Sequence, residues 1–175
     1  MIINRLTSTG PTKTAVTSIN SRLNTADIQS TNDTTNSILI PAAGTNYSFW
    51  GVFRLQVTAI TGGTVNNIKW FTDGTNSMGT GVGLVVNTAT AYTQATGTTG
   101  TTGIILSTGN YPTLAGAPVN AFTYTTGSPL SVTGTTSTAA DVGDYVVMQT
   151  TVTTTATQGT TATETITYRY DDTSS

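Results

Sequence analysis

The sequence contains no cysteine and no histidine. Without cysteine the chain forms no disulfide bond and no thiolate metal site. Without histidine it lacks the commonest metal ligand and the usual general base of catalysis. Serine and threonine are abundant, but a hydroxyl nucleophile needs a base to activate it. We therefore expect a protein that is not an enzyme and that needs no metal or cofactor.

Charged residues are also scarce. They make up 8% of the 175 residues, and the formal net charge is −2. The six Lys and Arg residues are scattered along the chain, whereas nucleic-acid binding requires clustered positive charge. No apolar run approaches the roughly 20 residues of a membrane-spanning helix, and the first residues lack the apolar segment of a signal peptide. We expect no direct nucleic-acid or membrane contact, and assembly in the cytoplasm.

Threonine takes the place of charge and makes up about a quarter of the residues. Its β-branched side chain favours strands and covers a solvent-facing sheet without charge. Short apolar runs alternate with turns rich in Gly, Pro, Asn and Ser, and we predict strands over residues 37–40, 84–86, 88–95, 104–106, 119–125, 129–133, 144–152 and 162–170. The pattern predicts an all-β fold, an antiparallel β-sandwich that is jelly-roll-like or immunoglobulin-like.

The clearest alternation lies in the stretch from Tyr47 to Phe71. The residues predicted to share one face occupy odd positions: Tyr47, Phe49, Phe53, Leu55, Val57 and Ala59. The polar residues Ser48, Arg54, Gln56 and Thr58 occupy even positions between them, so one face of a strand is apolar. The run stops at Gly62-Gly63, a pair that can take the positive φ angles of a tight turn. We predict a long β-hairpin here, with the aromatic face at the centre of the core.

Residues 1–37 are polar and weakly patterned, and residues 38–175 hold the predicted sandwich. Composition leaves two interpretations of the first segment open: a partly disordered tail, or an extended N-terminal arm that orders on a neighbouring subunit. In the second interpretation, scattered apolar residues anchor the arm to the partner. These candidate partner-binding residues are Ile2, Ile3, Leu6, Val16, Ile19 and Leu23.

Tryptophan and carboxylate side chains supply the remaining candidates. Trp50 occupies an even position, away from Phe49 and Phe53, where it either meets a partner or packs in the core. A carbohydrate-binding surface is an alternative, and it would use the aromatic residues Trp50, Trp70, Tyr92 and Tyr111. Asp141 and Asp144 are spaced as half of a Ca²⁺ site, but a hydrogen-bonded turn is the favoured interpretation.

Two segments carry a resemblance to known proteins. NYSFWGVFRLQVTAITGGTVNNIKWFTDG (residues 46–74) contains an aromatic run with a KWF return strand. DVGDYVVMQTTVTTTATQGTTATETITYRYDD (residues 141–172) contains a GDYVV strand, a small-residue turn and an ETITYRY strand. Both resemble segments of β-sandwich virion proteins of tailed bacteriophages, and together they cover about a third of the chain.

The resemblance implies a structural role in the virion. Such proteins serve as capsid decoration (cement) subunits that bind the outer surface of the shell and bridge neighbouring major capsid proteins, or as fibre and tail accessory modules. It implies the major capsid protein as partner, a homo-oligomer with a trimer favoured, and a place on the capsid surface. It supplies no catalytic residues.

Overall fold

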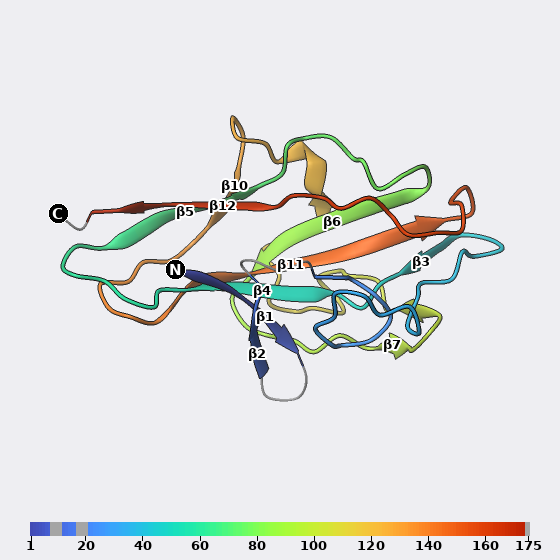
Figure 1. Cartoon of the computed structure of the whole chain (residues 1–175), viewed down its shortest axis with the longest axis horizontal. Helices are drawn as coiled ribbons and strands as arrows, with labels where there is room; N and C mark the ends of the chain where they lie inside the picture. The colour runs from blue at the N-terminus through green and yellow to red at the C-terminus, as the bar shows by residue number, and fades with distance from the viewer. Residues whose placement is uncertain (8–11, 17–20, 174–175) are drawn as a thin grey trace.

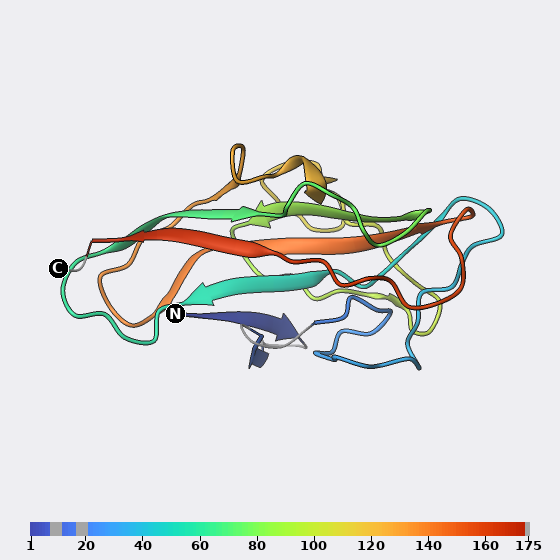
Figure 2. The same ribbon diagram turned by 45° about the horizontal axis from the view of Figure 1, so that its top comes forward.

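The computed structural model describes residues 1–7, 12–16 and 21–173, and it shows an all-β protein. The strands run mainly along the long axis of the molecule and form two packed sheets (Figures 1 and 2). This architecture confirms the predicted antiparallel β-sandwich. In the described ranges, no helix is long and apolar enough to span a membrane.

Sheet A is the larger layer, with the strand order β2-β1-β4-β11-β6-β9, and β3 pairs with the end of β11. Every neighbouring pair is antiparallel. The central strand β11 is the longest, with 13 residues, and it pairs with β4 and β3 on one side and with β6 on the other. The strands are β1 (Ile2–Thr7), β2 (Thr12–Ala15), β3 (Thr45–Tyr47), β4 (Gly51–Gln56), β6 (Val82–Ala89), β9 (Val119–Asn120) and β11 (Asp141–Thr153).

Sheet B is smaller and has the order β10-β5-β12. Its strands are β5 (Val65–Phe71), β10 (Leu130–Val132) and β12 (Thr167–Asp172). A two-stranded ribbon, β7 (Gly97–Thr98) and β8 (Thr102–Gly103), and a single-turn 3₁₀ helix, η1 (Ala121–Thr123), complete the described structure. Sheet B covers only one face of sheet A, which leaves the other face to be covered by loops.

Sheet A therefore separates two hydrophobic clusters. The inner core lies between the sheets and includes Phe53, Leu55, Ile68, Trp70, Val86, Val132, Val146 and Met148. The outer core lies on the opposite face of sheet A, and its members are Leu6, Phe49, Trp50, Val52, Ala89, Ala95, Leu106, Tyr111, Leu114 and Val147. Adjacent residues of β11, Val146 and Val147, belong to different clusters, as the two-residue period of a strand requires.

The predicted hairpin over residues 47–71 is wrong in its pairing. Gly62 and Gly63 do take positive φ angles of 73° and 77°, as the turn prediction required. However, β4 pairs with β1 and β11, whereas β5 pairs with β10 and β12. Both edges of β4 are already occupied, so the glycine turn leads the chain from sheet A to sheet B, and β4 and β5 face each other across the inner core.

The extended N-terminal arm is not confirmed. Residues 2–7 and 12–15 form an antiparallel pair of strands at the edge of sheet A, and β1 pairs with β4 over five residues, from Ile2 opposite Gln56 to Leu6 opposite Val52. The reason is that β1 is apolar on both faces: Ile3 packs against the inner core and Leu6 lies in the outer core. Of the predicted anchors that lie in the described ranges, Ile3, Leu6, Val16 and Leu23 instead pack in or against the chain's own cores.

Several of the shorter strand predictions also differ from the structure. Residues 84–86, 129–133 and 144–152 correspond to β6, β10 and β11, so these predictions are confirmed. Residues 37–40 and 104–106 form no strand. Of the strand predicted over residues 88–95, only residues 88–89 are in a strand, at the end of β6, and of the strand predicted over 119–125, only residues 119–120 are in β9. The strand predicted over 162–170 begins later, at Thr167, as β12. Residues 104–106 lie in the loop layer over sheet A, and Leu39 is hydrogen-bonded to Thr101 and to the side chain of Asn46 in β3. Neither apolar triplet belongs to a strand.

Candidate binding groove

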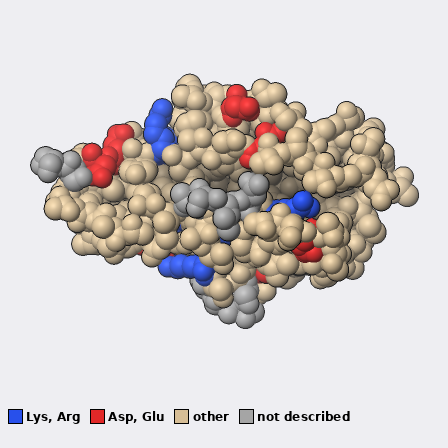
Figure 3. All heavy atoms as spheres, viewed as in Figure 1, with Lys and Arg blue, Asp and Glu red and all other residues tan. Residues whose placement is uncertain are grey.

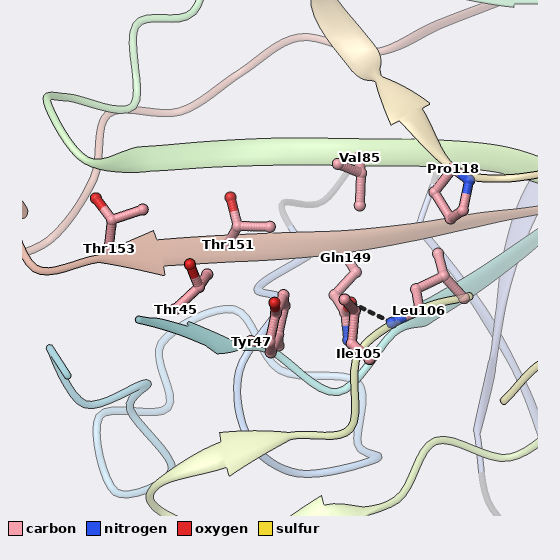
Figure 4. Close-up of a pocket in the computed structure, with 9 residues that line it drawn as sticks. All are labelled: Thr45, Tyr47, Val85, Ile105, Leu106, Pro118, Gln149, Thr151 and Thr153. Carbon is pink, nitrogen blue, oxygen red and sulfur yellow. Dashed lines mark hydrogen bonds between the residues drawn. The ribbon is translucent and has the colours of Figure 1, made fainter. Parts of the chain in front are cut away.

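The loop layer over the outer face of sheet A is incomplete, and a groove of about 420 Å³ remains open beside the outer core. Its floor consists of the outward-facing residues of β11, Gln149, Thr151 and Thr153, together with Val85 of β6. Gln149 and Val85 are direct partners in the register of the two strands, so both point to the same face (Figure 4).

The sides of the groove come from segments that are far apart in the sequence. Thr45 and Tyr47 of β3 lie along one side, Pro118 lies beside Val85 on the other, and Ile105 lies at the end nearest the outer core (Figure 4). No charged side chain lines the groove in the described part of the chain. Aliphatic and aromatic surfaces alternate with hydroxyl groups, which suits an uncharged binding partner.

Exposed aliphatic side chains lie on segments that adjoin this groove, and one of them, Ile105, lines it. We define the aliphatic rim as Leu39, Ile40, Ile104 and Ile105, whose exposed fractions lie between 40% and 51%. The backbone of Leu39 is fixed to the groove region, because its N–H donates to the Thr101 carbonyl at 3.1 Å and its carbonyl accepts from Asn46 of β3 at 2.9 Å. Single exposed aliphatic residues are ordinary, but four on adjoining segments are typical of a contact surface.

The surface elsewhere is almost without charge. On the face seen in Figure 3, the Lys, Arg, Asp and Glu side chains are scattered among uncharged residues. The closest grouping involves Lys13, Arg54 and Asp141: Asp141 is paired with Lys13, and its carboxylate lies 4.0 Å from Arg54. Arg54 also donates to the Gly143 carbonyl at 2.8 Å and lies over the Tyr145 ring. These contacts hold β2, β4 and β11 together.

The pair Asp141 and Asp144 is part of this network. Both lie in the first residues of β11, where the register with β4 shifts, and Gly143 takes a φ of 78°. Partial burial raises the pKa of Asp144 and nearby Arg54 lowers it, with burial the larger effect. No group of three metal-ligating side chains occurs among the described residues. The two carboxylates are thus located in a strand bulge, rather than in the turn that the sequence favoured.

Trp50 lies in the outer core. It is 2% exposed, its ring lies 5.5 Å from that of Tyr111, and its indole N–H donates to the Thr93 carbonyl at 2.8 Å. Of the two interpretations that the sequence left open for Trp50, the structure shows core packing. Its apolar surface faces side chains of its own chain and is not available to a partner.

The N-terminal candidates are also largely internal. Leu6 is buried, Ile2 is half-buried in β1, and Ile3, Val16 and Leu23 pack against the inner core. Ile19 lies outside the described residues. Arg5, which the sequence analysis passed over, is fully buried beside them, and its Nη1 donates to the Arg22 carbonyl at 2.6 Å and to Ser21 Oγ at 2.9 Å. These contacts hold β1 against the segment that begins at Ser21.

The aromatic residues proposed for carbohydrate binding do not form an exposed platform. Trp50, Trp70 and Tyr111 are buried. Tyr92 is half-buried, its hydroxyl donates to Asp27 at 3.3 Å, and burial, followed by the negative charge of Asp27, raises its pKa. The aromatic side chain that does line the groove is Tyr47, which the sequence analysis placed on the core face of the predicted hairpin.

Sequence reasoning missed the groove, although one signal for it was present. Gln149 stands directly after the apolar run from Tyr145 to Met148, and an amide in a buried strand requires hydrogen-bond partners. That position indicates a second segment packed against the strand. The identity of that segment, residues 104–106, is set by long-range folding and is not visible in a local pattern.

Comparisons with known proteins supply no relative for this architecture. No protein-family model matches the chain, and no curated protein or solved structure matches it.

Proposed function

We propose that this chain is a structural protein of a virion, a capsid decoration subunit that binds the outer surface of the shell and bridges neighbouring major capsid proteins. The observation that carries the proposal is the uncharged groove with its aliphatic rim. Branched aliphatic side chains bind best to a protein surface of matching shape, because their burial is favourable and non-directional. The resemblance of residues 46–74 and 141–172 to phage virion proteins supplies the setting.

The size of the rim explains why such a subunit would act in many copies. Complete burial of an aliphatic side chain contributes about 1.5–3 kcal/mol, so four side chains that are already about half-buried contribute roughly 3–6 kcal/mol. Association costs about 4–15 kcal/mol in lost translational and rotational freedom. One groove therefore binds weakly. Bridging two shell proteins, or binding as a homo-oligomer such as the trimer that the resemblance implies, turns weak contacts into stable attachment.

The first experiment is sedimentation of the native chain in a lysate of its source. A decoration subunit co-migrates with DNA-filled particles at hundreds of copies per particle. A few copies per particle would assign the chain to a tail or fibre instead. Migration only as a free small oligomer would contradict a virion role, and a glycan panel would then test the carbohydrate-binding alternative.

A matched pair of variants tests the surface itself. Replacing Ile104 and Ile105 by threonine keeps the β-branched shape and removes apolar area, so we expect at least about tenfold weaker binding to capsids stripped of this chain. Ile28→Thr is the control, because Ile28 is 41% exposed and belongs to neither the groove nor the rim. Equal loss in both variants would show that the rim has no special role.

A further inference from the structure

Gln149 occupies an unusual place between the groove and the outer core. It points to the outer face of β11, and its side chain is completely buried. Val147 and Thr151 are the neighbours of Gln149 on the same face of β11. Val147 belongs to the outer core, whereas Thr151 lines the open groove. The amide therefore lies where the covered part of the sheet face ends.

The side-chain amide of Gln149 makes three short hydrogen bonds. Its Nε2 donates to the Ile104 carbonyl at 2.7 Å and to the Ser48 carbonyl at 2.8 Å. Its Oε1 accepts from the Leu106 N–H at 2.7 Å, the bond drawn in Figure 4. In a parallel pair of strands, a residue opposite Ile105 would bond the carbonyl of Ile104 and the N–H of Leu106. The side-chain amide of Gln149 bonds these same two groups. The amide thus replaces a neighbouring strand.

Residues 104–106 depend on this replacement because they belong to no strand. Their other hydrogen bonds run to loop residues: the Ile104 N–H donates to the Thr96 carbonyl at 3.0 Å, and the Ile105 carbonyl accepts from Asn110 at 2.8 Å. Gln149 ties the segment directly to the central strand of sheet A. Ile104 and Ile105 remain exposed at the rim, while Leu106 enters the outer core.

We infer that Gln149 is a positioning residue that presents the Ile104–Ile105 part of the aliphatic rim to the binding partner. This inference rests on the proposed function, because it assumes that the rim is the contact surface. A rim held in one conformation before binding loses less conformational entropy when the partner docks, so its affinity is higher than that of the same side chains on a mobile loop. The amide itself touches no partner, because it is buried.

The test compares Gln149→Met with Gln56→Met. Methionine has nearly the length of glutamine but cannot pair with Ile104 or Leu106. Gln56 lies at the end of β4 opposite Asp141, eight residues along β11 from Gln149, and its Oε1 accepts from Asn4 at 3.1 Å, so the control loses one amide of the same kind. We expect Gln149→Met to bind stripped capsids at least about tenfold more weakly, and Gln56→Met to bind as the unaltered chain does.

Hydrogen exchange separates local positioning from general loss of stability. In the unaltered protein, the Leu106 amide should exchange at least about a hundredfold more slowly than the amide of exposed Gly109, although neither lies in a strand. In Gln149→Met, Leu106 should lose this protection while Val147 keeps its own. Rapid exchange of Leu106 in the unaltered chain would overturn the inference even if Gln149→Met failed to fold.

The outcomes also distinguish this inference from the proposed function. Weaker binding by the Ile104 and Ile105 variant, together with full binding by Gln149→Met, would leave the rim as the contact surface and refute the positioning role. Full binding by both variants would refute the rim itself. Weaker binding by both, with selective loss of Leu106 protection, supports the role of Gln149.

Discussion

Replacing Leu6 by alanine tests whether the N-terminal strand belongs to the folded domain. Leu6 is 2% exposed and lies in the outer core, opposite Val52 of β4. The substitution removes three buried carbon atoms, which corresponds to about 2.4 kcal/mol at 0.8 kcal/mol each. The cavity that remains adds to this loss. Because β1 lies near the edge of sheet A, where neighbours can move inward, we expect about 3 kcal/mol of lost stability, in the lower part of the range for such substitutions.

Urea denaturation followed by tryptophan fluorescence measures this change, because both Trp50 and Trp70 are buried and become exposed on unfolding. At about 2–4 °C per kcal/mol for a chain of this size, the melting temperature should fall by about 6–12 °C. Leu39→Ala is the matched control: Leu39 is 51% exposed, so its loss should change stability by less than about 0.5 kcal/mol. Equal stability of Leu6→Ala and the unaltered chain would refute our placement of β1 and favour an arm that orders only on a partner.

Two further predictions concern the backbone and the pH dependence of stability. Gly143 and Gly62 both have positive φ angles, but a Cβ at Gly143 would lie 3.0 Å from the nearest side-chain carbon, whereas a Cβ at Gly62 would have nothing within 4 Å. In chemical denaturation, Gly62→Ala should lower the free energy of unfolding by roughly 1 kcal/mol, and Gly143→Ala should lower it by about 1 kcal/mol more. Equal losses in the two variants would contradict the tight packing around Gly143. Burial raises the pKa of Tyr111 to about 12 and raises that of Tyr168 further, whereas burial lowers the pKa of Arg5 to about 10. Above pH 10 the tyrosines release protons on unfolding, and Arg5 takes up fewer protons than they release, so stability should be constant from pH 7 to 9 and fall above pH 10. Tyrosinate absorbance equal to that of all seven tyrosines while the chain is still folded would contradict this expectation.

The faces of the strands could be predicted from the sequence, because they depend on local alternation. Phe53, Leu55 and Val57 share one face of β4 and its continuation, and all three lie in the inner core as expected. The prediction is wrong for Phe49, which precedes the first residue of β4 and lies with Trp50 in the outer core. The partner of each strand could not be predicted in this way. Gly62 and Gly63 form a turn in either topology, and the alternation of β4 does not indicate that β1 and β11 occupy both of its edges.

The candidate surface could not be predicted for a related reason. An apolar triplet such as residues 104–106 is typical of a short buried strand, but burial depends on the space that the rest of the fold provides. Here the outer core accommodates Leu106 and leaves Ile104 and Ile105 exposed. The same limit applies to Trp50, because the segment that covers it includes Thr93 and Tyr111, about 40 to 60 residues further along the chain.

The change of residue type along β11 explains why the fold is stable although the loops leave the end of this strand uncovered on its outer face. On the outer face, Val147 is covered by the outer core, Gln149 satisfies its amide with residues 104–106, and Thr151 and Thr153 line the open groove. A threonine offers a hydroxyl to water and a methyl group to a protein surface, so this end of the strand is stable both when hydrated and when covered. An aliphatic residue at either position would favour permanent cover or aggregation. The threonines thus leave the groove stable in contact with water and compatible with the partner that we propose.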